Sequence, residues 1–213
     1  MRVNHCLRII SFALLCLAYS EGYSQSFILL MGGQSFGGKI ISEDEERLKF
    51  ETKKKNGKIK YVNIWLDQVF SVTTDGKEKI YYKVDSTDED MYSVEEMRLY
   101  IYGQQDARAN HKTPLPVIVG FSVSAVLGVF LGSKNSALLV VSPVVGTLAG
   151  SSTQNNRPKT KYARNEKVLQ SPAYIEGYRK GARGKKIFNS IIASVAGGIA
   201  GGVVGLISAN SQP

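Results

Sequence analysis

The stretch IFNSIIASVAGGIAGGVVGLISA, residues 187–209, decides the fold of this chain. Its 23 residues carry no charge, and a helix needs about 20 apolar residues to cross a bilayer. Small residues recur at every fourth position: Ala193, Gly197, Gly201, Gly205 and Ala209. A spacing of four returns to nearly the same helix face, and such a stripe lets helix backbones approach closely in lipid. The stretch therefore predicts a transmembrane helix packed tightly against another helix, in this chain or in a second copy.

Two more uncharged stretches lie upstream, residues 115–132 and residues 136–152. The few residues between them predict a helical hairpin over 115–152, although the second stretch is short and contains Pro143. We therefore expect three glycine-rich transmembrane helices, the alternative being buried helices of a soluble core. The residues expected at helix contacts are Gly120, Ser124, Gly128, Gly132, Gly146, Gly150, Gly197, Gly201 and Gly205.

A short internal repeat precedes the first and third stretches. Tyr100-Ile-Tyr-Gly103 begins one copy and Tyr174-Ile-Glu-Gly177 begins the other, and each is followed by an Ala-Arg pair and lysine. We expect each copy to form a juxtamembrane helix, with tyrosines at headgroup level and basic residues beside the bilayer. The residues assigned to this lipid interface are Tyr100, Arg108, Lys112, Tyr174, Tyr178, Arg183, Lys185 and Lys186. Residues 153–186, a basic linker and the second such helix, carry ten Lys+Arg and two Glu. Their expected counterions are anionic lipid headgroups rather than nucleic acid.

Residues 25–92 read as a strand-rich domain. Leu48, Phe50 and Thr52 alternate with charged residues, and Asn56-Gly57 and Asp75-Gly76 are typical of hairpin turns. Five or six strands predict a small antiparallel β-barrel or curled sheet of SH3-like size, which makes the fold class α+β. The expected core is Ile28, Leu30, Ile40, Leu48, Phe50, Tyr61, Val69 and Ile80. Trp65 could cap the barrel, mark a binding face or be an ordinary rim aromatic.

The remaining segments complete the predicted organisation. Residues 1–24 have the basic start, apolar run and small residues of a signal peptide, and both cysteines lie within them. Residues 93–114 form the first juxtamembrane helix, which begins at the capping box of Ser93 and Glu96. With three spans, the β-domain and residues 153–186 share one face of the membrane. Export makes that face periplasmic, whereas the positive-inside rule would make it cytoplasmic.

The chemistry-bearing residues are sparse. Gly33 to Lys39 matches G-x-x-x-x-G-K, but Ile40 stands where a phosphate loop needs Ser or Thr. The acidic residues 85–90 lack the glycine of a calcium loop. His111 is the one histidine beyond the signal segment. We expect no enzymatic activity, no metal site and no cofactor.

These segments together resemble exported bacterial envelope proteins of unknown function that have a small β-domain followed by glycine-rich membrane helices. The resemblance is carried by Gly38-Lys-Ile-Ile41, by the Tyr102 to Arg108 stretch, and by Glu176-Gly-Tyr178 before a basic cluster. It implies a location in a membrane of the bacterial cell envelope. We expect the inner membrane rather than the outer. The expected function is a membrane-anchored interaction or scaffold protein that binds an envelope partner through its β-domain and could self-associate. The alternative is a component of an oligomeric pore or transport assembly.

Overall fold

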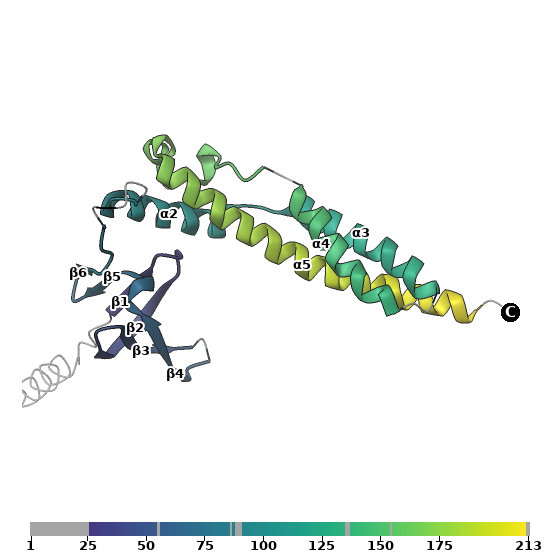
Figure 1. The fold of residues 1–213 in the computed structure, drawn as a ribbon, viewed down its shortest axis with the longest axis horizontal. Coiled ribbons are helices and arrows are strands. Elements are labelled where there is room, and N and C mark those ends of the chain that lie inside the picture. The colour runs from purple at the N-terminus through teal and green to yellow at the C-terminus, as the bar shows by residue number, and fades with distance from the viewer. Residues whose placement is uncertain are drawn as a thin grey trace, which may run out of the picture. The chain divides into compact units, whose positions relative to one another are not determined.

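The structure is a computed structural model that describes residues 26–54, 56–85, 87, 91–134, 137–153 and 155–211. The expected signal peptide lies outside the described residues, so export and cleavage stay predictions. The described chain forms two compact units (Figure 1). One is a β-sheet unit of residues 26–29 and 35–81, and the other is a helical unit of residues 30–34 and 82–211. The α+β class expected from the sequence is confirmed.

The β-sheet unit contains one antiparallel sheet of six strands in the order β4-β3-β2-β1-β5-β6. The strands are β1 (Ser26–Leu30), β2 (Ser35–Glu43), β3 (Arg47–Lys53), β4 (Ile59–Trp65), β5 (Val69–Thr74) and β6 (Lys77–Ile80). Strands β4 and β6 are the two edges and do not pair with each other. Of the two forms expected, the sheet is therefore the open one and not a closed barrel.

Strand β2 makes this open sheet curl. Its first half pairs with β1 and its second half with β3, and the register shifts between Ile40 and Ser42. At Gly38 a side chain would collide with the carbonyl of Glu51, so glycine permits the close approach of β2 to β3. The curl brings the Glu43 carboxylate 2.7 Å from the Lys79 ammonium of β6. This hydrogen bond lowers the pKa of Glu43, although so exposed an ion pair adds little stability.

The core of the sheet follows the alternation read from the sequence, with two errors. Ile28, Leu30, Leu48, Phe50 and Val69 are buried as expected, and Ile40 is half-buried. Tyr61 and Ile80 were placed wrongly, because both are exposed. Strand β4 turns the opposite set of residues inward, with Val62 opposite Phe50 and Ile64 opposite Leu48. Ile80 ends the edge strand β6, where little covers it. The buried apolar residues of the strands that are absent from the expected core are Ile64, Phe70 and Val72.

The helical unit contains α2 (Val94–Asn110), α3 (Pro114–Ser133), the 3₁₀ turn η2 (Ala137–Val140), α4 (Val141–Ser152) and α5 (Pro172–Asn210). Short 3₁₀ turns also occur at Leu66–Gln68 (η1), Thr160–Tyr162 (η3) and Glu166–Gln170 (η4). The capping box predicted at the start of α2 is present. The Ser93 hydroxyl accepts from Glu96 N, and the Glu96 carboxylate accepts from Ser93 N.

Only α3 and α5, among the described residues, are long and apolar enough to cross a membrane. The prediction of three transmembrane helices is therefore wrong. Residues 137–140 form a 3₁₀ turn, and the 12 residues of α4 extend roughly 18 Å, short of a hydrocarbon core of about 30 Å. In contrast, the second juxtamembrane helix and the last span join without a break into the 39 residues of α5.

Helices α3 and α5 run in the same direction and pack directly on each other, and α4 runs back against both of them (Figure 1). Along α3, Gly120 lies against Ser194, Gly128 against Gly198 and Gly132 against Gly202, so contacts advance together on both helices. Along α4 the order reverses, because Gly146 lies against Gly120 and Gly150 against Pro116. The chain therefore returns beside α3 before α5 begins.

Candidate functional site: the glycine contacts and polar junction of the helical unit

The interior of the α3–α4–α5 bundle is built from the smallest side chains. A Cβ at Gly128 would lie 2.8 Å from the carbonyl oxygen of Gly198, and one at Gly132 would lie 2.7 Å from that of Gly202. Such positions accept only glycine, because the opposing atoms belong to backbone that cannot move aside. The expected contact residues that are buried here are Gly120, Ser124, Gly128, Gly132, Gly146, Gly150, Gly197, Gly201 and Gly205. All of these contacts lie within one chain.

Serine hydroxyls supplement the glycine contacts. The hydroxyl of Ser124 donates to the carbonyl of Ser194 at 2.6 Å, which ties α3 to α5. Ser190 is fully buried, and its hydroxyl lies 3.5 Å from the carbonyl of Pro116. The hydroxyl of Ser194 is also buried and has no partner in the described structure. Polar groups are thus placed inside the bundle.

The outer surface of the same bundle is apolar. Val126 is 70% exposed on α3, and Leu148 and Ile199 are 65% and 64% exposed on α4 and α5. Other large apolar side chains exposed on these helices include Ile118, Phe121, Phe130, Val144, Phe188, Ile192, Val203, Val204 and Ile207. Water-soluble helices bury such residues and expose polar ones. The bundle is therefore inverted, with small and polar groups inside and large apolar groups outside.

The two copies of the internal repeat pack against each other. A Cβ at Gly103 of α2 would collide with the carbonyl of Tyr174 of α5, and one at Gly177 of α5 would collide with the carbonyl of Tyr100 of α2. The contacts are reciprocal, because in each copy the glycine meets the tyrosine that begins the other copy. The two repeats therefore pack as a parallel pair through equivalent residues.

This packing places the expected lipid-interface residues in two groups. Tyr100, Tyr174 and Tyr178 are buried within the helical unit, whereas exposed positions at headgroup level were expected for them. Lys186 is buried too, at 5% exposure. Tyrosine has an apolar ring and a polar hydroxyl, so it can lie at a membrane interface or in a core that supplies a partner for the hydroxyl. The basic residues that stay at or near the surface are Arg108, Lys112, Arg183 and Lys185.

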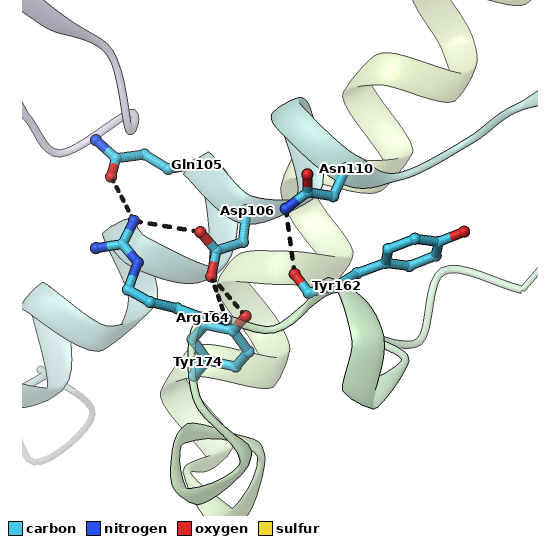
Figure 2. A network of polar contacts seen from close by, with 6 residues as sticks. All are labelled: Gln105, Asp106, Asn110, Tyr162, Arg164 and Tyr174. Atoms are coloured by element: carbon cyan, nitrogen blue, oxygen red, sulfur yellow. Dashed lines mark hydrogen bonds and ion pairs between the residues drawn. The ribbon is translucent and has the colours of Figure 1, made fainter.

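Asp106 supplies the polar partner, as Figure 2 shows. One of its carboxylate oxygens accepts from the Tyr174 hydroxyl at 2.9 Å and from Arg164 N at 3.1 Å. The other lies 3.2 Å from the Arg164 guanidinium, which also donates to Gln105 and stands over the Tyr102 ring. A buried carboxylate needs such partners. The network therefore fixes the segment between α4 and α5 to α2. Sequence reasoning missed it, because 58 residues separate Asp106 from Arg164.

The junction between α2 and α3 is basic and partly buried. His111 is 5% exposed, and its Nδ1 lies 3.4 Å from the Tyr178 hydroxyl. Burial lowers the pKa of His111, and the nearby charges of Lys185 and other lysines lower it further. Lys185 also donates to the carbonyl of Arg108 at 2.6 Å, at the C-terminal end of α2. A cation there is favourable, because the last carbonyls of a helix carry partial negative charge.

The described residues include no cluster of three or more His, Cys, Asp or Glu that could hold a metal ion. No protein-family model, curated protein or solved structure matches the chain. The glycine and serine contacts can hold α3, α4 and α5 together in apolar surroundings. The Asp106 network can hold the polar segment that carries Arg164 beside α2.

Two alanine substitutions in α5 should have opposite effects. Gly177→Ala should destabilise the chain by about 1–3 kcal/mol, since its methyl group would meet the Tyr100 carbonyl. Gly184→Ala is the control, because nothing lies within 4 Å of a Cβ there and alanine favours a helix by up to about 1 kcal/mol. Thermal unfolding in detergent, followed by circular dichroism, measures both. Equal melting temperatures would show that the α2–α5 contact is not close.

Removing the Asp106 carboxylate should release the segment that carries Arg164. Asp106→Ala should cost roughly 1–3 kcal/mol, because the buried Tyr174 hydroxyl and the Arg164 backbone lose their acceptor. Trypsin should then cleave faster at the basic residues of 157–167. Glu166→Ala, at an exposed position of the same segment, should leave the cleavage rate unchanged. Unchanged cleavage of the Asp106 variant would contradict the role of the network.

Proposed function

We propose that this protein is a membrane-anchored scaffold or interaction protein of the bacterial cell envelope. Its β-sheet unit would be presented to a partner on one side of the membrane, and α3 and α5 would be its anchor. The role is mechanical and positional rather than enzymatic, and it needs no cofactor.

The inverted bundle is the observation that carries this proposal. Its exposed Val126, Leu148 and Ile199 would be costly in water, whereas hydrocarbon solvates them well. Its buried glycines supply what apolar side chains cannot supply in lipid, because helix association there depends on close contact and hydrogen bonds. The hydroxyl of Ser124, bonded across to α5, is of this kind.

The parallel course of α3 and α5 supports one topology. Both helices would enter the membrane from the same side. The turn η2 and α4 together lead the chain back to that side along α3 and α5, since Leu139 lies against Gly202 and Gly150 against Pro116. Helix α2, the segment that carries Arg164 and the N-terminal half of α5 would therefore stay on that side. The Asp106 network is consistent with this, since it joins these three parts outside the apolar zone. The β-sheet unit lies on the same side, because no apolar span separates it from α2 among the described residues. We propose that this side is periplasmic, as an export signal would require.

An oligomeric pore is the second candidate. Glycine contacts fill the space between α3, α4 and α5 in one chain, so a lumen would have to form between several chains. Their outer faces, lined by residues such as Phe130 and Ile199, would then surround it. Apolar walls disfavour a water-filled lumen, and the scaffold is therefore the better supported function.

Cysteine labelling tests the anchor and its topology together. In a background with Cys6 and Cys16 replaced by serine, exposed cysteines are introduced singly as Glu45→Cys, Lys161→Cys and Ser211→Cys. The first two should react with a membrane-impermeant maleimide once the outer membrane is opened, and the third should react only after the inner membrane is lysed. Resistance of the protein to alkaline carbonate extraction gives an independent check. Labelling of Lys161→Cys without Glu45→Cys would refute a shared face.

A further inference from the structure

One face of the β3–β4 hairpin has an unusual composition for a solvated surface. The cross-strand pairs Arg47–Trp65, Lys49–Asn63, Glu51–Tyr61 and Lys53–Ile59 lie on this face, while Leu48, Phe50 and Ile64 point to the core. Ile59, Tyr61 and Trp65 are 57%, 58% and 43% exposed. We name the eight paired residues the hairpin face. It joins three large apolar or aromatic side chains with three cations and one carboxylate.

Cations and aromatic rings are organised together on the hairpin face. The guanidinium of Arg47 stands 3.8 Å from the centre of the Trp65 ring, and the Lys49 ammonium stands 5.8 Å from that of Tyr61. Such pairs place the charged group over the face of the ring, where the electrons of the ring attract it. Tyr and Trp with Arg and Lys is the combination that favours the interface between water and lipid headgroups.

The charge of the β-sheet unit is concentrated at the same hairpin. Residues 47–65 carry seven Lys+Arg and one Glu, whereas the rest of residues 26–84 carries four Lys+Arg and seven Asp+Glu. Edge strands often use lysine to prevent pairing with other sheets, and β4 is an edge. That purpose explains the charge of the strand but not the exposure of Tyr61 and Trp65 beside it, since exposed aromatics on an edge promote association.

We propose that the hairpin face docks on the anionic surface of the bilayer that α3 and α5 cross. The inference rests on the proposed membrane anchoring, which keeps the β-sheet unit close to a lipid surface and so raises the effective concentration of headgroups. The cations of the face pair with lipid phosphates, and Tyr61, Trp65 and Ile59 enter the headgroup layer. A weak affinity suffices, because docking of a tethered unit is intramolecular.

Trp65 is the only tryptophan of the 213 residues, so its fluorescence reports on this face alone. The full chain is reconstituted into vesicles of phosphatidylcholine, with or without phosphatidylglycerol. In anionic vesicles, Trp65 emission should shift to the blue and be quenched by brominated lipids, and high salt should reverse both effects. Emission that is identical in the two lipids and unaffected by brominated lipids would overturn the proposal. A blue shift of Trp65 emission without quenching by brominated lipids would also overturn the proposal, because Trp65 would then be covered by protein instead of lipid.

A matched pair of double variants separates local charge from total charge. Lys49→Glu with Lys53→Glu should lower the ratio of docked to undocked protein by at least about 25-fold, since the loss of each basic residue near an anionic surface accounts for about five-fold and the introduced carboxylates are repelled by it. Lys77→Glu with Lys83→Glu changes the net charge equally at exposed positions outside the hairpin and should leave docking nearly unchanged. Equal effects of the two pairs would refute the assignment of this face.

Carbonate extraction of the same vesicles tests the membrane anchor separately from the docking of the hairpin face. A chain that is extracted has no membrane anchor, and the proposed function fails. A chain that resists extraction while Trp65 stays in water retains its anchor and lacks the docking face. Circular dichroism of each variant confirms that the sheet is intact before either conclusion is drawn.

Discussion

The distance at which α5 can approach α2 and α3 governs the whole helical unit. At Gly103, Gly177, Gly201 and Gly205 the opposing atom is a backbone carbonyl, so a single methyl group would push the helices apart. Close approach brings the serine hydroxyls within reach of carbonyls across the interface. It also leaves the large side chains no room inside, so they lie on the outside. The inverted surface and the buried polar groups are thus both consequences of the glycine stripes.

Close approach through glycine occurs in both halves of α5, although the surroundings of the two halves differ. Its C-terminal half meets α3 through glycine and serine under an apolar exterior, where lipid would supply the surroundings. Its N-terminal half meets α2 through Gly177 and Gly181, but there the neighbouring side chains are tyrosines whose hydroxyls need partners. Asp106 satisfies one of them and Arg164 neutralises Asp106. Close glycine contact is therefore used twice along α5, once beside polar side chains and once inside an apolar exterior.

Features with a local or periodic cause could be predicted from the sequence. The helix start at Ser93 follows from a capping box four residues long, and the stripe from Gly197 to Gly205 follows from a spacing of four. The residues of β4 that face the core could not be predicted, because residues 58–65 have apolar side chains on both faces of the strand. Only the pairing with β3 determines that Ile64 is buried and Tyr61 is exposed. The shortness of α4 depends on where a helix begins within an uncharged run. The contact of Asp106 with Arg164 depends on tertiary folding alone.

The two repeats differ in one respect that gives the pair a mechanical asymmetry. The first is interrupted between α2 and α3, where Pro114 begins a new helix, whereas the second is a single rod of 39 residues, roughly 58 Å long. Because α5 continues without a break from one part to the other, a tilt of its apolar half would also move its N-terminal half. Membranes of different thickness impose different tilts on their helices. Stress in the bilayer would therefore reach Tyr174 and the Asp106 network as a displacement, while the break before Pro114 lets the first repeat yield.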